Sequence, residues 1–156
     1  MIRRKRRGFT FAELLVVMLV IAILGGMMIM RYIELKHRAL TAQATADMEN
    51  VRLAAFTKFY DTGQWPSGAG PGVVPAELVP YLGAGFSFNR RDYQLEFENF
   101  VPMGGGSTPT YQIAIRFTSS NQNLVNTMIQ VVGHRSPYVV LGTDVAVILV
   151  GPDGQT

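Results

Sequence analysis

The sequence predicts an α+β fold, in which one long N-terminal helix packs on a small antiparallel β-sheet head. An uncharged apolar run leads into a segment with apolar residues every three or four positions, which indicates the helix. Later segments alternate apolar and polar residues, which indicates the strands. With 156 residues and no cysteine, the chain has room for one modest core, and packing alone must stabilise it.

The first element is an uncharged run from Leu14 to Met30, which extends back to Phe9 with Glu13 as its single acid. As a helix, residues 9–30 measure roughly 33 Å at ~1.5 Å per residue, enough to cross a bilayer core. The leader before it is basic, and the rest of the chain has more acidic than basic residues. This asymmetry predicts a cytoplasmic N-terminus and an extracytoplasmic head.

Two ordinary explanations of this N-terminus stay open. A secretory signal peptide also begins with basic residues, but its apolar core is shorter and ends at a small-residue cleavage site, and no Ala-x-Ala site follows Met30. A plain signal anchor is the second explanation. Glu13 argues against it, because an ionised carboxylate is costly inside a bilayer and marks a functional position.

The residues from Arg7 to Val17 read Arg-Gly-Phe-Thr-Phe-Ala-Glu-Leu-Leu-Val-Val. This run resembles the class III signal of type IV pilins and type II secretion pseudopilins. The resemblance implies that a prepilin peptidase removes the leader, residues 1–8, by cutting after Gly8, and methylates the new amine of Phe9. It also implies a single-pass protein of the inner membrane that joins identical or related subunits in a helical filament, through an inner-membrane assembly platform.

Glu13 is the fifth residue counted from Phe9, as the family pattern requires. In a filament, its carboxylate could meet the Phe9 amine of a neighbouring subunit. Such a contact would replace a lone charge in apolar surroundings with an ion pair that fixes the axial register. The alternative is that Glu13 only extends its carboxylate to the membrane interface.

The apolar helix departs from the family pattern because it contains no late proline, the first proline being Pro66. Gly25 and Gly26 are the nearest substitute. Each glycine weakens a helix by roughly 1 kcal/mol relative to alanine, so we expect bending or local melting there when the helix packs into a filament. Close approach of another helix at these small residues is the alternative role.

Residues 31–62 are predicted to continue the same helix as an amphipathic outer half, giving one helix from Phe9 to about Tyr60. His37 lies on the apolar face and is expected to be a structural residue at its border rather than a metal ligand. The helix should end before Gly63, which can adopt a left-handed cap. The apolar face consists of Ile33, Leu40, Ala44, Met48, Val51, Ala55 and Phe59.

The head is predicted to comprise residues 63–156. We expect a short helical turn within Pro75–Leu82 and a helix that starts at Ser119, Ser120 or Asn121 and stops at Gly133. A first hairpin should pair residues 93–98, with Gln94, Glu96 and Glu98 on the polar face, with residues 111–117. A second hairpin should join residues 139–141 to residues 145–150 across Gly142-Thr143-Asp144.

An enzyme is not expected, because the chain has only His37 and His134, no cysteine and no paired catalytic motif. Gly104-Gly105-Gly106 lacks the neighbours of a phosphate-binding loop. Arg90, Arg91 and Arg116 form a predicted exposed basic patch, but three arginines in a net-acidic mature chain disfavour nucleic acid as a partner.

Two passages resemble the major pseudopilins of type II secretion in particular. One is Phe59–Pro66, similar to the aromatic-Asp-Gly-aromatic-Pro passage after their first helix, and the other is the closing run from Gly151 to Gln155. A loop in that family often binds calcium, so Asp144 and Asp153 are calcium candidates. Turn-forming roles for both residues are the alternative.

These resemblances favour a structural subunit of a filament-like assembly, in type II secretion. The absence of a cysteine pair disfavours the disulfide-bounded region common in pilins. A type IV pilus subunit for adhesion, motility or DNA uptake is the first alternative. A membrane-anchored extracytoplasmic binding domain is the second, and it predicts a chain that retains Met1 to Gly8.

Overall fold

The computed structural model describes residues 9–100, 112–134 and 136–151. The expectations for Gly8, the three glycines at 104–106, Tyr111 and Asp153 therefore lie outside the described residues. The chain divides into two units, Met1–Lys36 and His37–Thr156, and each is described by itself. The elements are α1 (Phe11–Thr62), η1 (Val79–Tyr81), β1 (Gln94–Asn99), β2 (Ile113–Thr118), α2 (Gln122–Val132), β3 (Tyr138–Leu141) and β4 (Asp144–Val150).

α1 is a single uninterrupted helix of 52 residues. It begins at Phe11, two residues later than expected, because Thr10 occupies the capping position before the first turn. It ends after Thr62 where Gly63 adopts φ of 70°, and the Gly63 N–H donates to the Phe59 carbonyl at 2.8 Å. The predicted left-handed glycine cap is confirmed.

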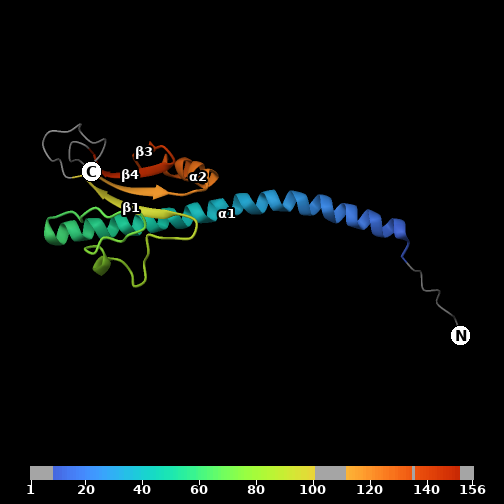
Figure 1. The fold of residues 1–156 in the computed structure, drawn as a ribbon, viewed down its shortest axis with the longest axis horizontal. Coiled ribbons are helices and arrows are strands. Elements are labelled where there is room, and N and C mark those ends of the chain that lie inside the picture. Colours follow the sequence, from blue (N-terminus) through green and yellow to red (C-terminus); the bar gives the residue numbers. More distant parts are fainter. Residues whose placement is uncertain (1–8, 101–111, 135, 152–156) are drawn as a thin grey trace. The chain divides into compact units, whose positions relative to one another are not determined.

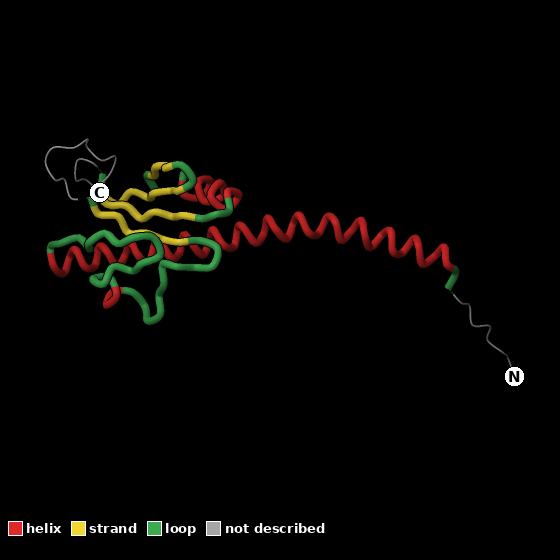
Figure 2. The backbone as a smooth tube through the Cα atoms, in the orientation of Figure 1, coloured by secondary structure: helices red, strands yellow, loops and turns green. Residues whose placement is uncertain are grey.

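The head contains one four-stranded antiparallel sheet in the order β1-β2-β4-β3. In Figures 1 and 2 the sheet lies alongside the C-terminal part of α1. Both predicted hairpin pairings are present, since β1 pairs with β2 and β3 with β4. The predicted α+β class, a long helix with a small antiparallel sheet, is confirmed.

The main core lies between α1 and one face of the sheet. From α1, Ala44, Met48, Val51 and Ala55 are buried, as the helical periodicity predicts. Ile33 is exposed, so the buried stripe begins nearer Leu40 than expected. The sheet and α2 supply much of the rest of this core, including Leu95, Phe97, Ile115, Phe117, Leu124, Val125 and Met128, and the segment between α1 and β1 adds Leu78, Phe88 and Tyr93.

α2 and η1 match their sequence signals. Asn121 caps α2, its side-chain oxygen accepting from the Asn123 N–H at 3.1 Å, and the helix stops before Gly133. Of the three cap candidates in the sequence, Asn121 is therefore the one used. The short turn expected within Pro75–Leu82 is the 3₁₀-helix η1.

The polar face of β1 differs from its prediction. Alternation predicted that Gln94, Glu96 and Glu98 would face solvent, yet the Glu98 residue is only 6 % exposed. Arg116 on β2 forms an ion pair with Glu98, and this pairing explains how a carboxylate is tolerated there. The predicted basic patch is only partly present: Arg91 is exposed, but Arg116 is paired with Glu98 and Arg90 with Asp47.

Candidate functional site

The apolar half of α1 exposes its side chains on every side. The large apolar residues between Leu14 and Met30 are about half exposed or more, and Phe9 is 82 % exposed. A contiguous apolar surface of this extent requires lipid or other helices to cover it. Among the described residues, α1 is the one helix whose length and composition would allow it to span a membrane.

Thr10 and Glu13 form a reciprocal capping box at the start of α1. The Thr10 hydroxyl oxygen accepts from the Glu13 backbone N–H at 3.3 Å, and Glu13 Oε2 accepts from the Thr10 backbone N–H at 2.8 Å. The Thr10 hydroxyl also donates to Glu13 Oε2 at 2.8 Å. The Glu13 carboxylate therefore has two donors within its own chain, and the first turn is fixed directly beside Phe9.

The other N-terminal candidates lie close by in sequence. Phe9 precedes the capping box and is the first described residue, whereas Gly8 lies outside the described part. Gly25 and Gly26 are helical, and a Cβ atom added at either would meet no atom within 4 Å. The isolated chain thus shows no break at this pair, and the expected bending within a filament stays a prediction.

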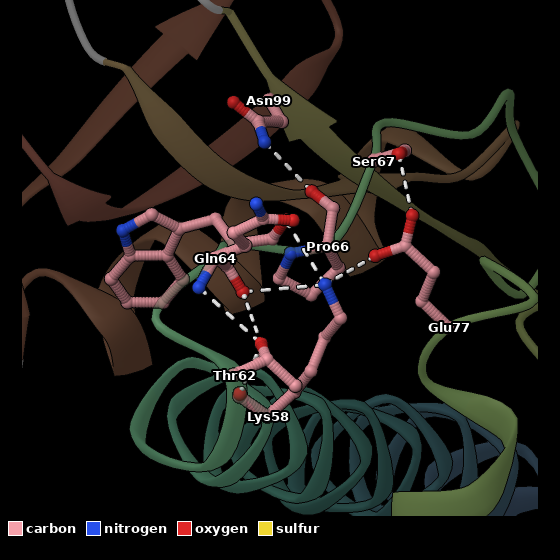
Figure 3. A network of polar contacts seen from close by, with 8 residues as sticks. Lys58, Thr62, Gln64, Pro66, Ser67, Glu77 and Asn99 are labelled. Atoms are coloured by element: carbon pink, nitrogen blue, oxygen red, sulfur yellow. Dashed lines mark hydrogen bonds and ion pairs between the residues drawn. The ribbon is translucent and has the colours of Figure 1, made fainter.

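A network of polar contacts joins the end of α1 to the loop that follows it (Figure 3). The buried Lys58 ammonium donates to the carbonyls of Gln64 and Trp65, at 3.3 and 3.2 Å, and pairs with the Glu77 carboxylate. Glu77 also accepts from the Ser67 hydroxyl at 2.7 Å. Hydrogen bonds from Lys58, and then from Ser67, hold the pKa of Glu77 below its usual range.

The aromatic residues of the passage Phe59–Pro66 pack together beside this network. The Trp65 ring stacks on Phe59 with ring centroids 4.5 Å apart, and it meets Phe56 edge-on at 5.1 Å. The Pro66 carbonyl accepts from the Asn99 side chain of β1 at 2.7 Å. The passage is therefore fastened to both α1 and the sheet.

Asp47 forms a second polar contact between α1 and the head. Its carboxylate accepts from Arg90 Nε at 3.0 Å, from Arg90 Nη2 at 3.3 Å and from the Tyr93 hydroxyl at 2.7 Å. Burial, and then the hydrogen bond to Asp47, raises the pKa of Tyr93 well above its usual value. Asp47 itself is buried, so its three donors replace the water that it loses.

The calcium candidates receive no geometric support. Asp144 Oδ2 lies 4.0 Å from Arg116 Nη1, a cation that would repel calcium, and Asp153 lies outside the described residues. Within residues 9–100, 112–134 and 136–151, no three His, Cys, Asp or Glu side chains are placed to hold a metal ion. The calcium hypothesis therefore stays untested.

His37 lies at the edge of the apolar face, as expected for a structural residue. It is partly buried, and its Nε2 lies 3.2 Å from Nδ2 of Asn121, the residue that caps α2. A groove between α1 and α2 is lined by Ala42, Met48 and Val131, with Arg38 and Glu49 among its charged residues. A pairing of nucleophile and base is missing from that lining.

Sequence reasoning overlooked Thr10, Asp47 and Lys58. Thr10-x-x-Glu13 before an apolar run is the capping-box pattern and was readable from the sequence. Asp47 and Lys58 fall on the buried face of α1, between positions that the periodicity assigns to the core. A charged residue at such a position signals a partner elsewhere in the fold, although it does not say which one.

Comparison with known proteins gives one match. Residues 3–29 match the family model described as "Prokaryotic N-terminal methylation motif". No curated protein and no solved structure matches the chain. The matched range contains the whole of the capping box and most of the exposed apolar run described above.

Proposed function

We propose that this chain, which carries at residues 3–29 the class III signal of type IV pilins and pseudopilins, is a structural subunit of a type II secretion filament. The motif supports the coarser statement, that the chain is a pilin-like substrate of prepilin peptidase. The secretion role is our proposal. The observation that carries the filament-subunit role is the uncovered apolar half of α1, with Thr10 and Glu13 at its start.

The apolar half of α1 has two environments that can cover it. Lipid covers a single-pass anchor, and the apolar helices of neighbouring subunits cover the same surface in a filament. Both the bilayer and the filament interior exclude water, so the apolar surface of the helix is covered before and after assembly. Such a surface suits a subunit stored in a membrane before assembly.

Cleavage after Gly8 would place a new amine at Phe9, immediately before the capping box. The peptidase would then methylate this amine. In the single chain the Glu13 carboxylate is satisfied by Thr10. In the filament, we propose that Glu13 also meets the Phe9 amine of a neighbouring subunit, and that this ion pair fixes the axial register.

The proposed topology follows from charge and length. Residues 1–8 are the cytoplasmic leader, residues 9–30 the membrane and assembly helix, residues 31–62 its outer half, and residues 63–156 the extracytoplasmic head. The apolar segment and the motif are consistent with a single-pass, membrane-anchored protein. The five basic residues of the leader support a cytoplasmic N-terminus in the inner membrane.

Type II secretion is proposed over a type IV pilus because of the passage Phe59–Pro66. Trp65 takes the aromatic position of that passage and stacks on Phe59, while Gly63 ends the helix. The aromatic and glycine positions of the pseudopilin-like pattern thus have structural roles in this chain.

The remaining proposed partners are the peptidase, related subunits and the inner-membrane assembly platform.

The first test is the mass of the N-terminal peptide of the protein isolated from its native membrane. A peptide that begins with N-methylated Phe9 is expected. A protein that begins at Met1 in every fraction would refute the proposal and favour a membrane-anchored binding domain.

The second test separates assembly from processing. Glu13→Leu should be cleaved normally but should yield few sheared filaments by electron microscopy, because the register contact is lost. Glu49→Leu, which removes an exposed acid from the outer half of α1, is the matched control and should assemble. Normal filament yield from Glu13→Leu would refute the assigned role of Glu13.

A further inference from the structure

The face of the sheet turned away from α1 carries a charged cluster that filament assembly does not explain. It consists of Glu96 and Glu98 on β1, Arg116 on β2 and Asp144 on β4. The neighbouring positions Leu95, Phe97, Ile115 and Phe117 face the main core instead. The four charged residues therefore lie on one face across three adjacent strands.

Arg116 is the cation of this cluster and faces all three carboxylates. Its strand register places it directly opposite Glu96. Nη2 pairs with Glu98, whereas Nη1 lies 3.7 Å from Glu96 Oε2 and 4.0 Å from Asp144 Oδ2. The single guanidinium thus makes its close contact with Glu98, and the other two carboxylates are held at longer range.

The side chains of the cluster are largely shielded from water, with exposed fractions from 6 % for Glu98 to 26 % for Arg116. Ala114 and Ala146 lie on the same face and are fully buried, with Val139 and Ile148 packed against them. The side chain of Glu96 is 16 % exposed. Its Oε2 is buried, and among the described residues this oxygen has no hydrogen-bond partner.

The charges of these four side chains do not balance. Three ionised carboxylates and one guanidinium give a net charge of −2 in a largely buried cluster. Burial is the main cause that raises the pKa of Glu96, and the negative charges of Glu98 and Asp144 raise it further, against the lowering effect of Arg116. Of the three carboxylates, Glu96 is the one with a buried oxygen that lacks a hydrogen-bond partner among the described residues.

We propose that this face of the sheet is a proton-binding site, in which Glu96 takes up one proton more readily than an ordinary glutamate does, and that this proton stabilises the folded head. The site rests on the packing of the sheet and is independent of the proposed filament role. Protonation reduces the net negative charge of the cluster by one unit, from −2 to −1. It also removes the charge from a buried oxygen that has no hydrogen-bond partner among the described residues.

The sign of the effect follows from the direction of the pKa shift. An unfolded glutamate has a pKa of about 4.3, and burial raises the pKa of Glu96 in the folded head. Between the two pKa values the folded state therefore binds more protons than the unfolded state. The stability gained is complete below the unfolded pKa and is lost as the pH rises through the folded pKa.

The test is denaturant unfolding of the full chain in detergent micelles from pH 5 to pH 8, followed by the fluorescence of Trp65, the single tryptophan. The denaturant midpoint of the wild type should rise as the pH falls. Glu96→Gln should have a higher midpoint than the wild type at pH 8 and a flatter pH dependence. Histidines ordinarily titrate in the same window, so the difference between the two proteins is the diagnostic quantity.

Glu49→Gln is the matched control, because Glu49 is exposed and pairs only loosely with Arg52, at 3.6 Å. It should keep the pH dependence of the wild type. Carbon-13 NMR of the glutamate carboxyl groups provides a second readout that does not depend on a variant folding, and one group should titrate clearly above the ordinary range. Identical pH dependences of wild type and Glu96→Gln, or a set of glutamates that all titrate in or below that range, would overturn the proposal.

Discussion

Replacing Lys58 with methionine should destabilise the head without disturbing the membrane segment. Methionine keeps most of the length of the side chain and removes the ammonium group. Lys58 is only 8 % exposed, and its Nζ serves two carbonyls and one carboxylate. The substitution therefore removes three charge-assisted contacts from a nearly dry position.

The stability change of Lys58→Met is the difference between the hydrogen bonds that are lost and the desolvation cost that is avoided. Each hydrogen bond to a charged group contributes about 1.5 to 3 kcal/mol, but the variant also avoids the desolvation of a buried ammonium. The Gln64 carbonyl keeps the Thr62 hydroxyl as a partner at 3.3 Å, and Glu77 is exposed enough to be hydrated. The Trp65 carbonyl is the group that loses most, so we expect a net loss of about 2 kcal/mol.

The assay is denaturant unfolding of the full chain in micelles, read by Trp65 fluorescence and by circular dichroism. Lys36→Met, which makes the same change at an exposed position on α1, is the control and should leave the midpoint unchanged. A double-mutant cycle with Glu77→Gln should give a coupling energy of the same sign as the loss. Unaltered stability of Lys58→Met, or zero coupling, would refute the reasoning.

The pH dependence gives an independent check on the same contact. Because the pKa of Glu77 is lowered by Lys58 and Ser67, its contribution is present above the unfolded pKa and is lost as the pH falls through the folded value. The stability difference between wild type and Lys58→Met should therefore shrink below about pH 4. The effect should be modest, since the Glu77 side chain is 39 % exposed.

Three further substitutions test other contacts of the fold. Asp47→Ala should lower the free energy of unfolding by about 3 kcal/mol, because it leaves Arg90 and the buried Tyr93 hydroxyl without their acceptor. A loss below about 1 kcal/mol in denaturant unfolding would contradict this prediction. Gly63→Ala should lower the free energy of unfolding by about 1 kcal/mol, because alanine is strained at φ of 70° even though its Cβ would meet no atom within 4 Å. An unchanged free energy of unfolding in the same assay would contradict this backbone strain. Thr10→Val should speed amide hydrogen exchange in the first turn of α1 and leave the exchange rates from Leu40 onward unchanged. Unchanged exchange in the first turn would show that the capping box does not stabilise it.

Much of the fold was predictable because its signals are local. The alternation of Tyr93, Leu95 and Phe97 predicted their burial, and Gly63 and Gly133 marked the ends of both helices. Glycine and proline limit helices through their own backbone preferences, and alternation follows from strand geometry, so neither signal needs knowledge of the tertiary fold.

The polar contacts were not predictable, because their partners are distant in the sequence. Asp47 meets Arg90, and Lys58 meets Glu77, only after the loop following α1 has folded back along the helix. The same limit explains the error at Glu98, whose alternation predicts solvent but whose carboxylate forms an ion pair with Arg116 of the neighbouring strand. At the candidate site, the family resemblance singled out Glu13, whose assembly role stays a prediction, and the capping role of Thr10 was local but was overlooked.

Asp47 and Lys58 also determine where α1 can sit along the head. A helix face made only of alanine, valine and methionine could slide by one turn, about 5.4 Å, and still bury a similar apolar area. With these two residues on that face, such a slide would move a carboxylate away from Arg90 and an ammonium away from Glu77, leaving two charges in apolar packing. Asp47 and Lys58, which carry opposite charges about three helical turns apart, thus restrict the outer half of α1 to one axial position along the head.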